Sequence, residues 1–207
     1  DTMESIIESE VSPFWKEETG GQVTFTVTQR HSWIKTSQRC LNYFALWKDI
    51  ASQVGFDENK ARHHLILYLG GSPADCSAGL GTLGDSINSG GYLYLNGNTS
   101  SLFAHELGHN LSLSHSNGLL CQNASDASYS TSETTLTHNC LHAQYRDLYD
   151  VMGFSWGPLG SLSTYQASQL GVLTRDQVVS SSSPLRVDLL PVSGHTGLVS
   201  LEVKDPQ

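Results

Sequence analysis

The chain has 207 residues, with 11 Lys and Arg against 20 Asp and Glu, and its formal net charge is −9. This length predicts one domain, or one domain with a small appendage, that buries a hydrophobic core of its own. No Lys or Arg stands between Arg62 and Arg146, which argues against nucleic acid and anionic membrane surfaces as partners. No apolar run approaches the roughly 20 residues that cross a bilayer, which predicts a soluble protein. Nine histidines are the unusual count.

Four cysteines stand at positions 40, 76, 121 and 140, without a Cys-x-x-Cys pair that would indicate a redox motif or a zinc ribbon. Their even number and the high Ser and Thr content predict two disulfides formed in an oxidising compartment, and therefore a secreted, extracellular protein. Three pairings are open. We favour Cys121–Cys140, which leaves Cys40–Cys76. The alternative is four buried free thiols in a cytosolic protein.

Hydrophobic periodicity and turn residues predict both helices and strands in the first half of the chain. Residues 3–18 have helical spacing with a kink at Pro13, and Gly20-Gly21 ends this helix. The later elements, in order, are a strand over 22–29, a helix over 41–54 that stops at Gly55, a central strand over 63–69, short strands over 79–83 and 92–95, and a helix that begins near 98–101 and runs through Leu111.

The second half is predicted to be less regular. Residues 112–140 are rich in Ser, Thr and Asn, and we expect them to form irregular surface. The remaining elements are a short helix over 163–170 closed by Gly171, a linker over 180–183, and two strands over 185–189 and 198–203. The fold class is therefore α+β, with two unequal subdomains whose junction near 105–115 lies in a cleft.

The strongest functional pattern lies at this junction, where residues 105–109 read His-Glu-Leu-Gly-His. Four residues along a helix turn about 400°, so the imidazoles of His105 and His109 lie about 40° apart and about 6 Å along the axis. Both can bind one metal ion from adjacent turns, and neutral imidazole suits zinc. Glu106 is then placed to take a proton from a metal-bound water. A chance occurrence of this pattern in a chain of this composition has a probability of about 2%, and the alternative interpretation is a surface or core helix that happens to carry two histidines.

A third ligand is expected at His115. A continuing helix would swing this residue about 240° round from His109, so the helix must break near residue 112. The stretch HELGHNLSLSH resembles the HExxHxxGxxH pattern of the metzincin zinc peptidases. In that family a glycine at the break supplies a left-handed turn. This chain has Ser112 there, at a cost of roughly 1–2 kcal/mol unless serine adopts another turn.

A second metzincin feature is a tight turn with a methionine beneath the three histidines. Residues 149–153 read Tyr-Asp-Val-Met-Gly, and Met152 resembles that methionine, although alone it would be interpreted as ordinary core. Astacin- and serralysin-like members carry a tyrosine two residues later as an extra ligand, whereas this chain has Phe154, which excludes those subfamilies. With the glycine-rich run over 78–84 and the β segment after the last helix, the chain most resembles gametolysin-like peptidases.

This resemblance implies a metzincin-like catalytic domain over 1–177. It comprises an upper subdomain over 1–112, with a mixed twisted sheet and helices, and a smaller irregular lower subdomain over 113–177. The active-site cleft lies between them, and 178–207 form a short C-terminal β appendage. In metzincins an edge strand above the active helix pairs with an extended peptide. The residues expected to bind substrate are Gly79, Leu80, Gly81 and Thr82 in that strand, or else in a glycine-rich loop, and Phe154 and Trp156 in a pocket wall, or else in the core.

Other candidate residues receive structural interpretations. His63 and His64 begin a strand and are expected to be structural, whereas His138 and His142 flank Cys140 and could approach the cleft. The resemblance also brings calcium into consideration. No EF-hand run is present, however, and we expect Asp147 and Asp150 to be caps or turn anchors.

The predicted function is zinc-dependent endopeptidase activity on extracellular proteins or peptides, with one Zn²⁺ held by His105, His109 and His115 and with Glu106 as general base. The chain is expected to act as a monomer. Two alternatives stay open. One is a gluzincin-like zinc peptidase with Glu133 as third ligand. The other is a non-catalytic binding module with a structural zinc, which would need a fourth protein ligand.

Overall fold

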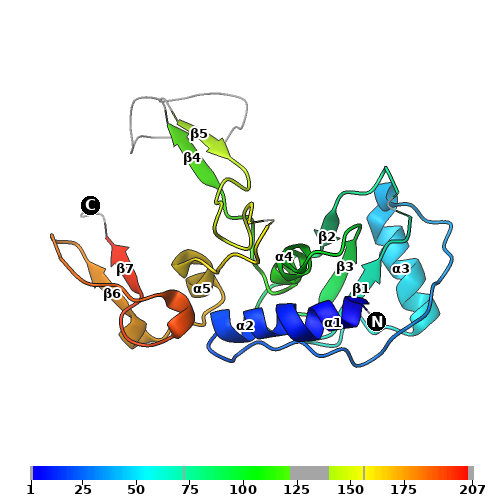
Figure 1. The fold of residues 1–207 in the computed structure, drawn as a ribbon, viewed down its shortest axis with the longest axis horizontal. Helices are drawn as coiled ribbons and strands as arrows, with labels where there is room; N and C mark the ends of the chain where they lie inside the picture. The colour runs from blue at the N-terminus through cyan, green and yellow to red at the C-terminus, as the bar shows by residue number, and fades with distance from the viewer. Residues whose placement is uncertain (1, 72, 122–139, 156, 205–207) are drawn as a thin grey trace.

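Helix α4 (Ser100–Asn110) lies at the centre of the structure, with a three-stranded sheet on one side and helix α5 (Thr164–Gln169) on the other (Figure 1). The computed structural model describes residues 2–71, 73–121, 140–155 and 157–204. Over these residues the chain is a mixed α+β protein, as the sequence predicts. None of the helices in the described ranges has the length and apolar character needed to span a membrane.

The N-terminal segment is helical, as predicted, and contains a π-helical stretch. It consists of α1 (Thr2–Ile6), the π-helix η1 (Ile7–Val11) and α2 (Ser12–Glu18). Proline has no N–H and cannot donate to the carbonyl four residues earlier. The wider π turn lies just before Pro13, where the Ser12 N–H donates to the Ile7 carbonyl. We attribute the π turn to this proline.

The sheet has the strand order β1-β3-β2, built from β1 (His64–Tyr68), β2 (Gly79–Gly81) and β3 (Gly91–Leu95). Strand β1 is parallel to β3, and β2 is antiparallel to β3. The prediction of a central strand over 63–69 is therefore wrong in position, because β3 is central and β1 is an edge strand. The apolar run of β1 reflects burial of both faces: Leu67 packs in the cluster around α3 (Tyr43–Val54), and Ile66 packs against the main core.

Residues 22–29 do not form a strand, so this prediction is wrong. The alternation of apolar and polar residues nevertheless reflects one buried face, since Val23, Phe25 and Val27 all pack against the main core. The backbone of this segment is bound by side chains rather than by a neighbouring strand. The Phe25 N–H donates to Ser12 Oγ at 2.9 Å, and the Val23 N–H donates to Thr19 Oγ1 at 3.0 Å. Period-two spacing thus indicates an extended segment with one buried face, but does not require strand pairing.

The predicted helix over 41–54 is confirmed as the 3₁₀ turn η2 (Cys40–Asn42) followed by α3. The Asn42 side chain caps α3 by accepting the Ala45 N–H, and Gly55 ends it at φ 70°. Trp47 of α3 stacks on Tyr92 of β3 with ring centroids 5.8 Å apart. The Cys40–Cys76 disulfide ties this helix to the segment before β2, and it is the pairing that the sequence left for these two cysteines.

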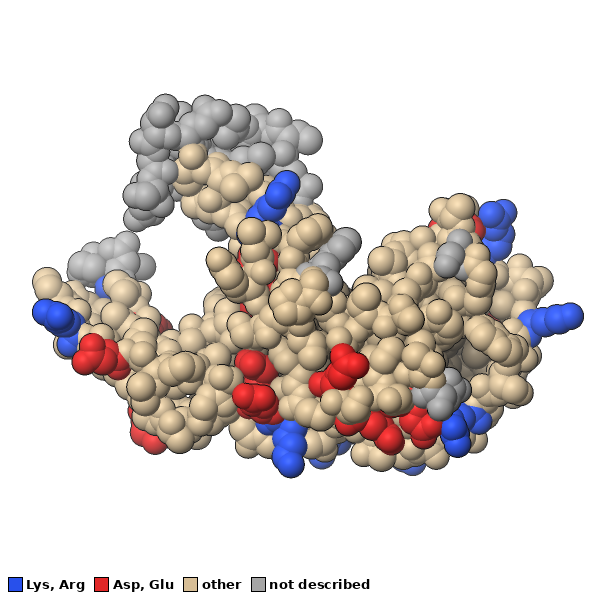
Figure 2. All heavy atoms as spheres, in the orientation of Figure 1, with Lys and Arg blue, Asp and Glu red and all other residues tan. Residues whose placement is uncertain are grey.

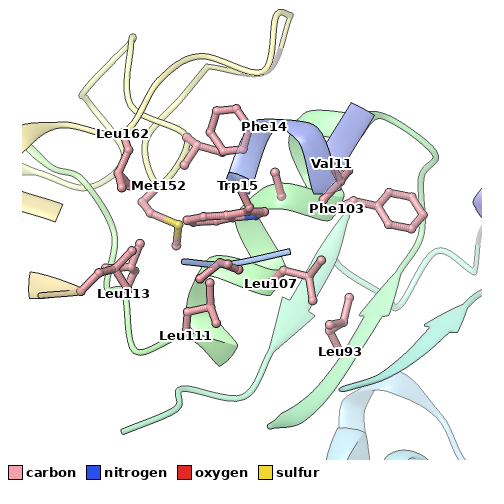
Figure 3. Packing of buried hydrophobic residues seen from close by; sticks show 14 of the residues in the cluster. Val11, Phe14, Trp15, Leu93, Phe103, Leu107, Leu111, Leu113, Met152 and Leu162 are labelled. Carbon is pink, nitrogen blue, oxygen red and sulfur yellow. The ribbon is translucent and has the colours of Figure 1, made fainter. Parts of the chain in front are cut away.

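The main core joins both halves of the chain around α4. Figure 3 shows the Met152 sulfur against the Trp15 ring, with Leu107 and Leu111 below the ring and Phe103 farther along, beside Val11. Trp15 and Met152 are completely buried. A Cβ on Gly108 would collide with the Met152 sulfur, so α4 and the 150–153 turn approach as closely as a glycine allows. Helix α4 is therefore packed on one side by α2 and by the turn that carries Met152.

The segment over 112–140, predicted to be irregular, contains strand residues at 118–121 and at 140. Strands β4 (Gly118–Cys121) and β5 (Cys140–Ala143) form an antiparallel pair that projects from the body (Figure 1). The prediction that all of 112–140 is irregular is wrong for these strands, and 122–139 lie outside the described residues. Cys121 is disulfide-bonded, and its backbone stands opposite that of Cys140 in the strand register.

The C-terminal part contains the predicted short helix, α5, with Gly171 after it at φ 72°. It continues through the 3₁₀ turn η3 (Arg175–Gln177) to a parallel pair of strands, β6 (Val178–Ser181) and β7 (Ser200–Val203), with the 3₁₀ turn η4 (Val192–Gly194) between them.

Strand β7 confirms the predicted strand over 198–203, but two other predictions for this segment are corrected. Ser180 and Ser181 belong to β6 rather than to a linker, and 185–189 are not a strand. Strand β6 begins with the β-branched pair Val178-Val179, and β-branched residues favour strands. We attribute the extension of the strand over the two serines to this pair. The subdomain boundaries at 112 and 177 stay predictions.

Charged side chains are sparse on the face that Figure 2 shows. Acidic side chains gather along its lower edge, where Figure 1 places α1 and α2, and the basic side chains stand apart from one another. The coloured part of this face therefore has no basic cluster of the kind that binds a phosphate backbone.

Removal of the Cys40–Cys76 disulfide is predicted to destabilise the fold. The bond closes a loop with a sequence separation of 36, and such a loop contributes roughly 3–4 kcal/mol by limiting the unfolded chain. We expect the double variant Cys40→Ala/Cys76→Ala to lose this amount in urea-induced unfolding. A loss below about 1 kcal/mol would show that the bond is not needed to hold α3 against the sheet.

Candidate metal centre

Helix α4 carries His105 and His109 and then stops in a way that redirects the chain. The helix ends at Asn110, and Ser112 has a φ of 88°. The Leu113 N–H donates to the Gly108 carbonyl at 3.0 Å, and the Ser112 N–H donates to the His109 carbonyl at 3.0 Å. These two bonds form a Schellman motif with serine in the position that glycine usually occupies. The predicted break at residue 112 is confirmed, and serine adopts the left-handed turn despite its cost.

This break brings His115 back to the helix. The ligand-capable atoms of His105, His109 and His115 all lie within 4.8 Å of one another, in an arrangement that could hold a metal ion. The ring centroids of His105 and His109, and those of His109 and His115, are 4.8 Å apart. The structure therefore brings together the three histidines that the sequence singled out.

Two of these imidazoles are oriented by backbone carbonyls. His105 Nδ1 lies 2.8 Å from the Val151 carbonyl oxygen, and His109 Nδ1 lies 2.7 Å from the Leu113 carbonyl oxygen. A carbonyl can only accept, so both Nδ1 atoms carry the proton and the lone pair remains on Nε2. Hydrogen bonds of this kind fix the tautomer and the orientation of metal-binding histidines. The rings are thus prepared to bind a metal through Nε2.

Burial keeps the three histidines neutral. It lowers the pKa of His105 to about 4, with a further contribution from the neighbouring His109, and it lowers the pKa of His115 to about 4. The pKa of His109 is also lowered by burial. A metal ion requires the unprotonated imidazole, so no proton competes for these ligands at neutral pH. The donor set therefore fits a metal ion.

Glu106 lies beside the histidines but outside the metal-binding group of the described residues. Its side chain is 5% exposed, and burial raises its pKa to about 8, an effect partly offset by the Gly81 N–H, which donates to the carboxyl group. A buried carboxyl group with a raised pKa next to three neutral imidazoles can exchange a proton with a group bound at the same place.

Strand β2 lies against this carboxyl group because its two glycines face Glu106 and its leucine faces the other way. A Cβ on Gly79 would collide with the Glu106 carboxylate, and one on Gly81 would stand 2.7 Å from the Glu106 carbonyl oxygen. The intervening Leu80 packs instead against the α3 cluster. The glycine-rich run contains the predicted edge strand, whose only strand neighbour among the described residues is β3. Its two glycines permit the close approach to α4.

Asn110 ties the end of β2 to α4, a role that the sequence does not reveal. Its Nδ2 donates to the Thr82 carbonyl at 2.8 Å and to Thr82 Oγ1 at 3.0 Å, and its Oδ1 lies 3.0 Å from His64 Nδ1. The Thr82 hydroxyl is also bound to the Tyr92 backbone, so this side chain is engaged inside the protein. The structural role predicted for His64 is confirmed by its bond to Asn110.

The turn around Met152 holds both His105 and the segment of His115. The Val151 carbonyl accepts from His105, while the Met152 carbonyl accepts the Ser116 N–H at 2.8 Å. Asp150 anchors the turn, since its two carboxylate oxygens accept the Met152 and Ser163 N–H groups. Asp147 accepts the N–H groups of Tyr149 and Asp150, so both aspartates are the turn anchors that the sequence predicts.

Two further residues at the site were missed by the sequence analysis. Buried Gln166 of α5 donates to the Ser114 carbonyl at 2.8 Å and to Ser116 Oγ at 3.0 Å, which fixes the chain on both sides of His115. Tyr145 lies with its ring centroid 3.9 Å from that of His115. Neither belongs to a recognisable motif, because their contacts depend on how distant segments meet.

Only some of the remaining predicted residues lie in the part of the chain that the structure describes. Phe154 follows the methionine turn and is 48% exposed, so it is not a core residue. His142 lies in β5, outside the three-histidine group. Trp156, Glu133 and His138 lie outside the described residues.

No family model, curated protein or solved structure matches this chain.

The metal-free protein is predicted to lose stability between pH 6.5 and 8 because of Glu106. With a pKa of about 8 in the folded state and about 4.3 in the unfolded chain, the folded state binds more protons in this window. The free energy of unfolding therefore falls as pH rises, by up to about 2 kcal/mol. We expect urea unfolding in the presence of a chelator to show this fall, and Glu106→Gln to abolish it. Equal pH slopes for the two proteins would contradict the prediction.

Proposed function

We propose that this protein is a zinc-dependent endopeptidase of the metzincin type. The observation that carries the proposal is the convergence of three neutral imidazoles, His105, His109 and His115, beside the buried carboxyl group of Glu106. Three histidines without a fourth protein ligand form a common donor set of catalytic zinc sites. Within the described residues, no fourth His, Cys, Asp or Glu joins the group, which supports a catalytic rather than a purely structural site.

Zinc, when bound, supplies Lewis acidity that polarises a carbonyl group and lowers the pKa of water. The chain itself supplies the proton transfers. Glu106 takes a proton from the attacking water and passes it to the leaving amine. Burial favours the protonated form of Glu106 in the metal-free site, and the positive charge of a bound metal ion would favour the ionised form that accepts the proton. The Gly81 N–H holds the carboxyl group in place during both transfers.

The substrate class is an extended peptide. The two glycines of β2 adjoin Glu106, and backbone pairing with such an edge would lay a peptide across the general base. Phe154, half exposed just after the methionine turn, supplies an apolar surface for a side chain beside the scissile bond. The disulfides support an extracellular setting and substrates.

The substitution Glu106→Gln tests the catalytic role. We expect the variant to fold and to bind one equivalent of zinc, because Glu106 is not in the metal-binding group, while peptide cleavage falls by about 10²–10⁴-fold. Zinc is measured by elemental analysis and cleavage with a quenched peptide library. The matched control is Glu8→Gln on the exposed face of the N-terminal helix, which should cleave normally. Undiminished cleavage by Glu106→Gln would overturn the proposal.

The substitution His115→Ala tests the ligand set. We expect loss of tightly bound zinc and of cleavage, since two imidazoles alone leave the site without its third donor. The exposed His31→Ala is the control and should retain both. If His115→Ala kept a full equivalent of zinc, the third ligand would have to be another residue, as in the gluzincin-like alternative with Glu133.

A further inference from the structure

The ring of Tyr145 lies against two histidines of the cluster. Its ring centroid lies 3.9 Å from that of His115, with 38° between the planes, and 6.0 Å from that of His105. Among the described residues, it is the one hydroxyl-bearing ring in contact with these histidines. The ring therefore borders the place where a ligand of the metal centre would lie.

The backbone holds Tyr145 there in an uncommon conformation. Its φ is 58°, in the left-handed region that a bulky residue rarely adopts. The Tyr145 N–H donates at 3.0 Å to Oδ1 of Asn117, two residues after His115. The adjoining backbone is close as well, since a Cβ on Gly118 would stand 2.6 Å from Cβ of Arg146. Backbone outliers that the surrounding structure holds in place cluster at functional sites.

The scarcity of basic residues around the site indicates that a neutral hydrogen-bond donor would have to stabilise negative charge there. No Lys or Arg occurs from 63 to 145, and Arg146 is exposed. A cation from the chain is therefore not available within that stretch to stabilise negative charge on a substrate. Phe154, after the methionine turn, has no hydroxyl. A phenol carries its proton at neutral pH and is a hydrogen-bond donor.

We propose that the Tyr145 hydroxyl donates a hydrogen bond to the oxyanion that forms on the scissile carbonyl at the three-histidine centre. This inference rests on the proposed function and makes Tyr145 a catalytic residue. The tyrosine forms no covalent bond and keeps its proton throughout, so it stabilises negative charge as an oxyanion-hole donor does. The contact between its ring and His115 does not depend on the hydroxyl, so the two can be tested separately.

The test compares wild type with Tyr145→Phe, which keeps the ring and removes the hydroxyl. The probe is a phosphinic analogue of tetra-alanine, whose tetrahedral anion resembles the oxyanion, and its Kd for the zinc-loaded protein is measured by calorimetry. We expect unchanged zinc content, a Kd weakened by about 10–100-fold, and kcat lowered by about 10²-fold with KM nearly constant. Imidazole, a neutral metal ligand, should bind both proteins equally. Tyr149→Phe, at a 79% exposed position nearby, should behave as wild type.

The outcomes separate this inference from the proposed function. If Tyr145→Phe binds the phosphinic peptide as tightly as wild type, or if it loses zinc, the hydroxyl role is overturned whatever the cleavage data show. Absence of measurable binding to wild type also overturns it. If the Kd weakens as expected but wild type cleaves no peptide, the donor role of Tyr145 stands and the peptidase proposal fails.

Discussion

A single helix cannot bring all three histidines to one point, and the rest of the site depends on how the chain meets this constraint. His105 and His109 share one side of α4, whereas a continued helix would carry His115 about 240° away from His109. The left-handed Ser112 ends the helix and reverses the chain. Because serine adopts this φ at a cost of roughly 1–2 kcal/mol, the surroundings must hold it there. Two Schellman hydrogen bonds and the complete burial of Leu113 do so.

The returning segment is then fixed by backbone carbonyls and a few buried polar side chains. Met152 provides a carbonyl to Ser116, and Gln166 of α5 binds on both sides of His115. The neighbouring Val151 carbonyl orients His105. The histidine cluster and the hydrophobic core consequently share the same turn. The turn that orients the imidazoles also places the Met152 side chain under Gly108 and against Trp15 (Figure 3).

The sequence predicted those parts of the structure that depend on local spacing. The helices around Pro13, before Gly55 and before Gly171 follow from periodicity and from stop residues, and the histidine cluster follows from the helix repeat and one necessary break. Strand pairing could be predicted less well from the sequence. The alternation over 22–29 indicates a buried face, but whether such a segment pairs depends on which sheet edge is free. The position of β1 at the edge, and the β6 strand in a serine run, depend on tertiary contacts in the same way.

The residues that the sequence did not reveal at the site share one physical property: each acts between distant segments. Asn110 joins α4 to β2 and to His64, 46 residues away. Gln166 acts across 52 residues on Ser114. Tyr145 contacts His115 with its backbone at a positive φ and its N–H bound to Asn117, 28 residues away. The first two side chains have neutral polar groups, as does the Tyr145 phenol. Charged groups would be poorly solvated in this buried setting, where burial keeps the three histidines neutral. The absence of Lys and Arg from 63 to 145 agrees with this, because no basic side chain of that stretch would compete with a cation that the three histidines could hold.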